Sequence, residues 1–440
     1  MEKTIFSKKF KNDYRKEDHF FVRNRLFSFP TIIAMKINII SKSLSVEVSK
    51  FLSKFHFSRK EKDGSKQAFS KARAKIKWEG FEYLNDMFIK QYYSDQEYKK
   101  YKGVYLVLGT DGTTYQLPYE EELVERFNEC NNGQAKQSRC LAQGVKIYDV
   151  LNKLTLLSSM DAYSATQSKG VSEQGGFENH LCKLPQLVDC EKHNILILGD
   201  KYYPGFYYFH ELPRLGYSYI FRCKADFCKE VEQFTQQDEV DDQLLSIDLK
   251  RGSRKYSSSA ARIENMPDTL LVRCVKIRLP NGEMEYLLTN IKEEELDLSE
   301  MQELYGCRWG EETSFDTDKN KIEIENFSSK TVNGVLQDFH ARTLSCNLTQ
   351  ILVRQAQEEL DAEQAQKQNI HHYQINLAVA IGLVKDELPK LLLGYESAEI
   401  WYNRMVKKIL RRREPIRPGR NFPREKKHNI KYHLNKRRVT

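Results

Sequence analysis

The chain has 440 residues, of which 40% are hydrophobic and 11% aromatic, so it is long enough to fold as two or three packed units. Lys and Arg outnumber Asp and Glu by 70 to 61, which gives a net charge of +9. This composition excludes a chain that is disordered throughout. The longest apolar runs fall well short of the roughly 20 residues that a membrane-spanning helix needs, so we expect neither membrane insertion nor a secretory signal.

The cysteines indicate a reducing compartment. Their total of nine is odd, and no two of them form a C-x-x-C pair. This pattern fits neither a disulfide framework nor a structural zinc site. We therefore expect free thiols in the cytoplasm.

The positive charge is concentrated at the C-terminus. Between Arg404 and Thr440 there are fifteen Lys or Arg residues against Glu414 and Glu425. Such a segment is attracted to polyanions, so nucleic acid is the first partner to consider and an anionic membrane surface the second. The alternative is a solvated tail that only aids solubility.

The N-terminal part of the chain has helical periodicity. From residue 20 to about residue 85, apolar residues recur at steps of three and four, as in Val48, Phe51 and Phe55. The stretch 64–76 predicts a basic helix capped by Ser65. It is either a helical DNA-reading unit or a basic face exposed to solvent.

The middle of the chain predicts three strands, a helix and a further strand. The apolar run 104–108 ends at Gly109-Thr-Asp111-Gly112, two short strands follow near 143–148 and 153–157, and 171–187 is more helical. The compact run 195–198 then ends at Gly199-Asp200. Acidic residues thus follow the first and the last of these strands.

The predicted type of secondary structure changes twice in the C-terminal half of the chain. From about 221 to 290 the segments are of β type, including 270–279 and 284–288, which predicts a β-rich insertion. After residue 296 the helical pattern returns and continues through 337–359 and 374–383.

The segment 305–319 carries the most specific pattern of polar residues. If it is helical, Tyr305, Arg308, Glu312 and Lys319 lie within an arc of roughly 60°. The carboxylate suits a divalent ion, and the cations suit a phosphate backbone. The alternative is an exposed Arg308–Glu312 pair, which contributes only about 0.3–0.5 kcal/mol.

Three acids are candidates for one metal site. Two-metal phosphoryl transfer needs carboxylates that converge from separated parts of the chain, and Asp111, Asp200 and Glu312 supply them. Asp111 is also explained by an ordinary turn, and Asp200 by a turn or helix cap.

These residues resemble a known family, the insertion-sequence transposases with a DDE triad. The spacing Tyr-x2-Arg-x3-Glu-x6-Lys at residues 305–319 is that of the insertion-sequence-4 branch, and Trp309 follows the motif Arg. The resemblance extends to Asp111-Gly-Thr with Leu117-Pro behind it, and to Asp200 with Tyr203-Pro behind it. After Asp200 the chain has Lys-Tyr-Tyr where relatives commonly have Arg-Gly-Tyr.

The resemblance implies an α/β fold: a ribonuclease-H-like (retroviral-integrase-like) catalytic domain interrupted by a β-rich insertion, with a helical N-terminal region and a basic helical C-terminal region. The expected boundaries are 1–95 for the N-terminal DNA-binding region, 96–220 and 299–395 for the two catalytic parts, 221–298 for the insertion and 396–440 for the tail.

The resemblance also implies the roles of individual residues. Asp111, Asp200 and Glu312 would bind two Mg²⁺ or Mn²⁺ ions, and the DNA-binding set would be Tyr305, Arg308, Trp309 and Lys319. The partners of the protein would be the inverted repeats at the transposon ends and target DNA. A homodimer would bind them in the bacterial cytoplasm, at the nucleoid.

The implied reaction is excision and integration of an insertion sequence by phosphodiester hydrolysis and strand transfer, cut-and-paste with a hairpin intermediate. Hairpin formation in this branch involves an extruded base stacked on a side chain of the insertion, for which Met284 and Tyr286 are candidates by position. The alternative for either residue is a core position in a strand.

Two other functions remain open. Thr110-Asp-Gly-Thr113 echoes the aspartyl-phosphate motif of haloacid-dehalogenase-like phosphatases, but Gly109 stands where that motif needs its nucleophilic Asp. The stronger alternative is a catalytically inactive, transposase-derived DNA-binding protein.

Overall fold

The computed structural model describes residues 1–23, 25–38, 42–55, 64–95, 97–130, 138–163, 170–189, 192–249, 266–279, 282–367 and 371–417. At Asp95, Trp309, Glu311 and Glu312 it describes the backbone but not the side chain.

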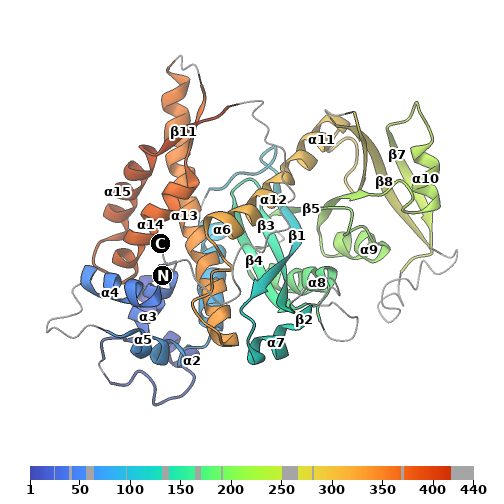
Figure 1. The fold of residues 1–440 in the computed structure, drawn as a ribbon. Coiled ribbons are helices and arrows are strands. Elements are labelled where there is room, and N and C mark those ends of the chain that lie inside the picture. The colour runs from blue at the N-terminus through green and yellow to red at the C-terminus, as the bar shows by residue number, and fades with distance from the viewer. Residues whose placement is uncertain are drawn as a thin grey trace.

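A central mixed sheet organises the middle of the chain (Figure 1). Its order is β2-β3-β1-β5-β6-β9-β8-β7, and β4 also pairs with β3. β3 is antiparallel to β1, whereas β5 and β6 continue the sheet in parallel and β9, β8 and β7 extend it antiparallel. The strands are β1 (Tyr105–Leu117), β2 (Glu129–Cys130), β3 (Arg139–Asp149), β4 (Leu154–Ala162), β5 (Asn194–Gly199), β6 (Ser218–Cys223), β7 (Asp242–Asp248), β8 (Thr269–Arg278) and β9 (Met284–Thr289).

The predicted mixed α/β architecture is confirmed. The expected three strands, helix and further strand are β1, β3, β4, α8 (Glu173–Lys183) and β5, with the short α7 (Glu121–Phe127) and β2 between β1 and β3. The strands expected near 270–279 and 284–288 are β8 and β9. Both pair into the same sheet as β1, so this β-rich segment extends the central sheet.

Alternating side chains of β1 and β5 pack against helices on opposite faces of the sheet, as strand geometry requires. On one face, Leu106 and Leu108 join a core that includes Phe177 of α8 and Phe209 of α9 (Phe206–Arg214). On the other face, Val107 and Leu196 pack with residues of α11 (Leu298–Cys307). The continuous apolar run of β5 follows from this double burial.

The N-terminal and C-terminal helices share a second core. Its buried residues come from both ends of the chain, and Figure 1 shows these helices side by side. The predicted helix after Ser65 is confirmed, and the hydroxyl of Ser65 accepts a hydrogen bond from Ala68 N at 3.1 Å. The helices are α1 (Glu2–Phe6), α2 (Lys8–Tyr14), α3 (Phe29–Ile37), α4 (Leu44–Lys54), α5 (Lys66–Arg73), α6 (Glu79–Asp95), α13 (Val332–Ala365), α14 (Leu377–Leu392) and α15 (Ala398–Leu410). The remaining elements are α10 (Lys229–Thr235), α12 (Trp309–Asp316), the 3₁₀ turn Leu184–Gln186 and the pair β10 (Tyr373–Ile375) and β11 (Arg413–Pro415).

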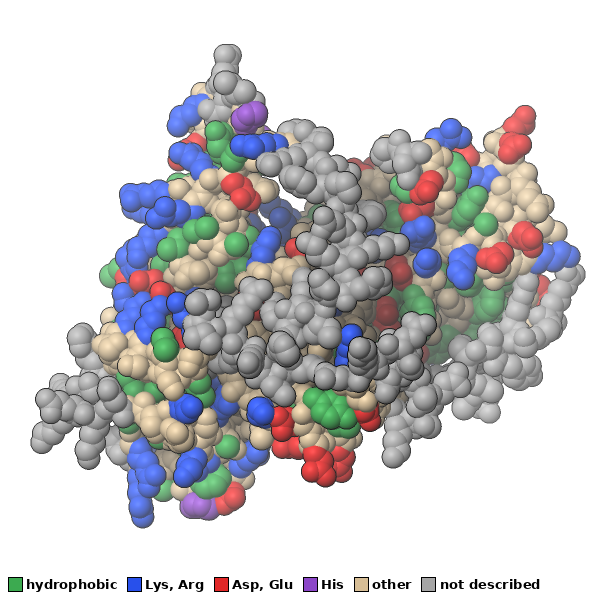
Figure 2. Space-filling view, viewed as in Figure 1, with side chains coloured by type: hydrophobic (Ala, Val, Ile, Leu, Met, Phe, Trp, Pro, Cys, Tyr) green, Lys and Arg blue, Asp and Glu red, His purple; other side chains and the backbone are tan. Residues whose placement is uncertain are grey.

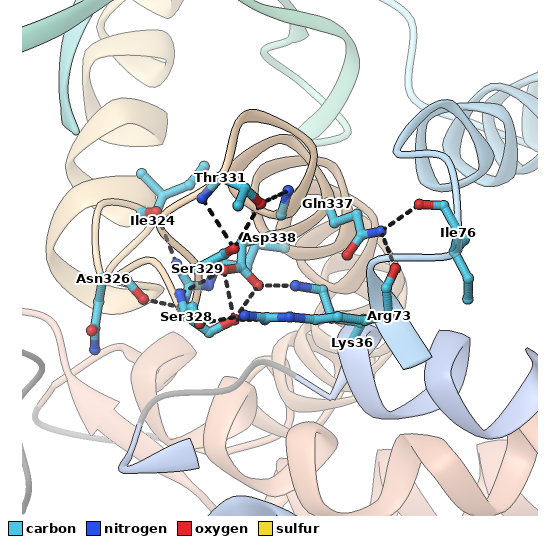
Figure 3. A network of polar contacts seen from close by, with 12 residues as sticks. Lys36, Arg73, Ile76, Ile324, Asn326, Ser328, Ser329, Thr331, Gln337 and Asp338 are labelled. Atoms are coloured by element: carbon cyan, nitrogen blue, oxygen red, sulfur yellow. Dashed lines mark hydrogen bonds and ion pairs between the residues drawn. The ribbon is translucent and has the colours of Figure 1, made fainter. Parts of the chain in front are cut away.

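A buried polar network joins α3, α5 and α13 (Figure 3). Lys36 of α3 forms an ion pair with Asp338 of α13, and both side chains are almost fully buried. Asp338 also accepts a hydrogen bond from Ser328 N at 2.6 Å, and Arg73 of α5 donates to the carbonyl oxygen of Ser328 at 2.6 Å. The network therefore ties the segment before α13 to the N-terminal helices.

His340 of α13 is a buried ring in the same region. It stacks on Trp78 with ring centroids 5.1 Å apart, and burial lowers its pKa to about 4. Folded protein therefore keeps this ring neutral below pH 6.5, where the unfolded chain binds a proton. The free energy of unfolding should fall as the pH drops from 6.5 to 4, by at most about 3 kcal/mol from this residue.

The slope of the free energy of unfolding against pH corresponds to the number of protons taken up on unfolding. We expect His340→Phe to reduce this number by about one between pH 4 and pH 6.5, because phenylalanine keeps the stack and cannot titrate. The measurement is urea unfolding at intervals between pH 4 and pH 7. His180, whose pKa burial also lowers to about 4, should contribute a similar slope in both proteins. An unchanged pH dependence in the His340 variant would contradict the prediction.

Within the described part of the chain, none of the helices is long and apolar enough to cross a membrane.

Candidate active site beside two parallel strands

Asp111 and Asp200 lie next to each other at one edge of the central sheet. β1 and β5 are parallel, and Thr110 pairs with Gly199, so the residue that follows each of these is an aspartate. Neighbouring strands are roughly 4.8 Å apart, which brings the two residues together. Both side chains are half-buried.

Each aspartate also supports the local backbone. Asp111 Oδ1 accepts a hydrogen bond from Gly112 N at 2.8 Å. Asp200 Oδ1 accepts from Tyr202 N at 2.7 Å, and the carbonyl oxygen of Asp200 accepts from Tyr203 N at 3.1 Å. The turn role considered for Asp200 is therefore present, whereas the turn considered for Asp111 is absent, because Asp111 lies within β1 and pairs with Lys146 of β3.

Side chains alternate between the two faces of the sheet along each strand, and this directs both carboxylates toward the face that α11 covers. Asp111 is in phase with Val107, and Asp200 with Leu196 and Leu198, all of which pack in the core beneath α11. The cross-strand neighbour of Asp111 on β3 is Lys146. Cross-strand neighbours lie on the same face of the sheet, so an element that contacts the Lys146 side chain lies on the same face as the Asp111 side chain.

Lys146 connects this face of the sheet to α12. Its ammonium group donates to Ser314 Oγ at 2.8 Å and forms an ion pair with Asp318, and the Lys146 side chain is buried. α12 therefore lies over β1 and β3, on the side of the sheet toward which Asp111 is directed. Glu312 belongs to this helix, and the structure describes its backbone there.

The segment 305–319 is helical but is not one regular α-helix. α11 ends at Cys307, Arg308 separates it from α12, and residues Thr317–Lys321 form a π-helical turn. The wider turn changes the angular position of Lys319 relative to Glu312, so the arc calculated for a regular helix does not describe Lys319.

Tyr305 and Arg308 are buried between α11 and the sheet. The guanidinium of Arg308 lies 5.5 Å from the centre of the Tyr305 ring. An ion pair between Arg222 and Glu285, 2.9 Å long, lies near them and acts on the pKa of Tyr305. Burial raises that pKa to about 12, so the Tyr305 hydroxyl is neutral at physiological pH.

Lys319 reaches β1 close to Asp111. Its ammonium group donates to Thr113 Oγ1 at 2.5 Å and to the carbonyl oxygen of Thr114 at 2.9 Å, and it lies 5.6 Å from the centre of the Tyr115 ring. The structure thus brings the last residue of the predicted motif within two residues of the first aspartate. The side chain of Trp309, also assigned to DNA binding from the sequence, lies outside the described residues.

Glu173, which the sequence analysis did not single out, approaches the same two aspartates from α8. Its carboxylate lies over Gly112, where any Cβ would be 2.3 Å from Glu173 Cδ. It accepts hydrogen bonds from Gly112 N and from the Tyr203 hydroxyl, and Thr110 Oγ1 lies 3.4 Å from that hydroxyl.

The electrostatic environment of Glu173 is negative. Burial, with smaller contributions from the charges of Asp111 and Asp200, raises its pKa to about 7, although the hydrogen bonds from Tyr203 and Gly112 lower it. The local sequence signals only a helix start, since Ser172 caps α8 through a hydrogen bond from Gly175 N at 3.0 Å. No local pattern indicates that this helix start meets the ends of β1 and β5.

The donor set at this edge is suited to a hard divalent cation. Asp111, Asp200 and Glu173 offer carboxylate oxygens, which Mg²⁺ and Mn²⁺ prefer. Among the side chains that the structure describes, no three His, Cys, Asp or Glu are already arranged to hold a metal ion. The side chain of Glu312 is not among them.

The two base-stacking candidates lie at the start of β9. Met284 is 37% exposed, whereas Tyr286 is partly buried and packs against the core that contains α8 and α9. Met284 is therefore the more accessible of the two, and its stacking role stays a prediction.

Basic side chains gather over α15 in the described part of the C-terminal region (Figure 2). Lys407, Lys408, Arg411 and Arg412 are exposed there, while Trp401 packs in the helical core. The rest of the predicted basic tail, residues 418–440, lies outside the described residues.

Comparison with known proteins gives one family match. Residues 176–348 match the family model described as the transposase DDE domain. The matched stretch contains Asp200, α11 and α12, and it begins after Asp111 and Glu173. No curated protein matches the sequence.

Among solved structures, the chain is similar to one titled "Cryo-EM structure of piggyBac transposase synaptic complex with hairpin DNA (SNHP)". The identity is 12% and the TM-score 0.47, over 93% of this chain and 84% of that chain. The match of residues 176–348 to the transposase DDE domain, across the segment that carries Asp200 and Glu312, supports a DDE transposase.

Proposed function

We propose that the chain is a metal-dependent DNA transposase of the insertion-sequence-4 branch, with Asp111, Asp200 and Glu312 as its catalytic carboxylates. One observation carries the proposal: the two aspartates follow paired residues of parallel strands, on the face of the sheet over which α12 lies. Glu312 comes from that helix. In this proposal, carboxylates from separated parts of the chain would meet at one place on the sheet.

The proposed domain is ribonuclease-H-like, and the strand order supports it. Three antiparallel strands, β1, β3 and β4, are followed by β5 and β6, which run parallel to β1 with helices between them. Residues 221–298 would be the insertion, built around β7, β8 and β9. The other proposed units are 1–95, 96–220, 299–395 and 396–440.

Asp111, Asp200 and Glu312 would hold two Mg²⁺ or Mn²⁺ ions, and Glu173 would position Asp111. When bound, such ions lower the pKa of a coordinated water and stabilise the leaving oxygen of a phosphodiester. Gly112 N would keep one oxygen of Asp111 oriented within β1, and Tyr202 N would keep one oxygen of Asp200 oriented in the turn after β5. The hydrogen bonds that Glu173 accepts keep a third carboxylate beside them.

The residues Tyr305, Arg308, Trp309 and Lys319 would orient the transposon end. The contacts of Lys319 with Thr113 and Thr114, beside Asp111, support this role. Arg308 would act from its buried position over Tyr305. Excision and integration by cut-and-paste through a hairpin intermediate, with Met284 or Tyr286 stacking an extruded base, rest on the family resemblance.

The proposed partners are duplex DNA of the transposon ends and of the target, bound by a homodimer at the bacterial nucleoid. The net charge of +9 and the exposed cations of α15 support a polyanionic partner.

The test is cleavage of a duplex carrying the terminal repeats of the element that encodes the chain, in Mg²⁺, in Mn²⁺ and in EDTA. We expect metal-dependent cleavage by the wild type, no cleavage by Glu312→Gln, and DNA binding by both. Glu311→Gln, one residue away, is the matched control and should cleave normally. Equal cleavage by the Glu312 variant would overturn the assignment.

Binding without cleavage by the wild type under every metal condition would favour the inactive DNA-binding protein instead.

Replacing Glu173 with Gln should weaken Mn²⁺ binding by about 10–100-fold, the usual effect of losing a group that supports the metal ligands. Titration of Mn²⁺ followed by electron paramagnetic resonance measures this without any DNA. Glu178→Gln, on the same helix and within 3.2 Å of the Tyr208 hydroxyl, serves as the control. Wild-type Mn²⁺ affinity in the Glu173 variant would remove this residue from the site.

A further inference from the structure

A pocket of about 510 Å³ lies between the β3–β4 turn, α12 and its π-helical continuation, α13, and the β10–β11 pair. Three lysines from separate elements line it: Lys99 before β1, Lys153 in the β3–β4 turn and Lys321 at the end of the π-helical turn. Arg354 of α13 adds a fourth cation.

The three lysines are close enough to repel one another. Burial lowers the pKa of Lys153, and the charges of Lys99 and Lys321 lower it further. Within the described residues, Lys153 and Lys321 form no ion pair, and Lys99 lies 4.0 Å from Glu358 at an exposed position. Folding thus gathers like charges at one place without an equal number of carboxylates.

The acids in and beside the pocket already have other partners. Asp318 forms its ion pair with Lys146, and Glu414 accepts hydrogen bonds from Gln374 at 3.1 Å and Asn376 at 2.8 Å. Glu358 lies 3.6 Å from Arg354 as well as near Lys99. Since the four cations that line the pocket outnumber its two acids, Asp318 and Glu414, the potential inside it is positive.

A rigid frame holds two of the lysines in place. The amide of Asn152 donates to the carbonyl oxygen of Lys99 at 2.9 Å, and its oxygen accepts from Lys99 N at 2.8 Å. Asp149 Oδ1 accepts from Asn152 N at 2.9 Å. These bonds fix the turn in which Lys153 has a φ of 58°, a left-handed conformation that costs a non-glycine residue roughly 1–2 kcal/mol.

We propose that this pocket binds the phosphodiester backbone of one DNA strand, with Lys99, Lys153 and Lys321 contacting its phosphates. Lysine ammonium groups bind phosphates as point charges, and Thr313 of α12 and Thr317 of the π-helical turn line the same pocket. Its volume of about 510 Å³ is that of a small-ligand pocket, so it would take a short stretch of one strand and not a duplex. The inference rests on the proposed function, because it places this strand against the helix that carries Glu312.

The test compares Lys153→Asn/Lys321→Gln with the wild type. Asn tolerates the left-handed backbone at residue 153. Affinity for end-containing and for unrelated duplex DNA is measured in EDTA over a range of salt concentrations. We expect about tenfold weaker binding to both, and a slope of log K against log salt that is smaller by about 2, one for each lost phosphate contact.

The control is Lys192→Gln/Lys330→Gln, two exposed lysines outside the pocket and outside the proposed terminal DNA-binding regions, which removes the same charge and should leave the slope unchanged. Lys321→Gln alone should lower the slope by about 1, and it serves if the double variant does not fold. An unchanged slope in folded variants overturns the proposal. So does a loss of inorganic phosphate binding, measured by calorimetry, with DNA binding intact, since the pocket would then take a small anion.

Because the experiment is done without metal, its outcome is separate from that of the cleavage test. Salt-dependent DNA binding through these lysines by a chain that never cleaves would keep this inference and remove the proposed function.

Discussion

Replacing Asp200 with Asn is expected to slow metal-dependent DNA cleavage on the order of 10³-fold, because a catalytic metal supplies several kcal/mol of transition-state stabilisation. Asn keeps the oxygen that accepts a hydrogen bond from Tyr202 N, so the turn after β5 should persist. The substitution removes only the negative charge. Asp111→Asn should have the same effect, since Asn can still accept from Gly112 N.

Thermal unfolding separates loss of metal binding from loss of folding. Asp111 and Asp200 both raise the pKa of Glu173, which shows that the three carboxylates repel one another without metal. Removing one charge should therefore leave the metal-free melting temperature unchanged or slightly higher. The increase in melting temperature that Mn²⁺ gives the wild type should be lost.

Asp189→Asn is the matched control for these variants. Asp189 precedes β5, at the opposite end of the strand from Asp200, and forms a surface ion pair of 3.4 Å with Lys192. It should retain both cleavage and Mn²⁺ stabilisation. Cleavage at the wild-type rate by Asp200→Asn, or an unchanged response to Mn²⁺, would show that the strand-end aspartates do not form the site.

Replacing Asp338 with Ala is expected to lower the free energy of unfolding by about 3–5 kcal/mol, since it leaves the buried Lys36 without a counter-charge. Although burial alone would raise it, Lys36, Arg342 and Arg73 lower the pKa of Asp338, so its carboxylate is charged. Ser328 would also lose the acceptor of its N–H and of its hydroxyl.

A double-mutant cycle identifies the cause of this loss. Lys36→Met/Asp338→Leu removes both charges and should recover part of the stability, because a buried pair exchanged for apolar residues is often close to neutral. Urea unfolding of the wild type, both single variants and the double variant gives the coupling energy. Additive effects would show that the two charges do not depend on each other.

The Asp338→Ala substitution should also destabilise the segment that follows α12. Arg342 donates to the carbonyl oxygens of Ile324 and Asn326, each at 2.8 Å, and Asp338 holds Ser328 in the same stretch (Figure 3). Faster amide hydrogen exchange over residues 322–331 in Asp338→Ala would locate the change there.

Some elements of the fold can be predicted from the sequence, because they depend on residues that are close together in the chain. An apolar run that ends in Gly and Asp predicts a buried strand and its turn, and the structure has this arrangement at Asp200, directly after β5. At Asp111 the predicted turn is wrong, because β1 continues to Leu117 and pairs with β3 over that length. Ser65 before a basic helical run predicts a cap, which the structure contains. The spacing of residues 305–319 indicated a helical segment, and α11 and α12 occupy it.

Other features depend on contacts between residues far apart in the chain. The parallel pairing of β1 with β5 brings the two aspartates together, and the packing of α8 on Gly112 adds Glu173. The break at Arg308 and the π-helical turn allow Lys146 and Lys319 to connect α12 to the sheet, which no helical periodicity indicates.

The sequence by itself determined that strands form near 104–108, 143–148, 153–157 and 195–198 and that Asp200 follows a strand, because backbone preference and side-chain alternation act over a few residues. Only the tertiary structure decided that Lys99, Lys153 and Lys321 share one pocket and that the terminal helices share one core. Those groupings arise from burial and strand pairing across hundreds of residues, where sequence distance carries no information about distance in space.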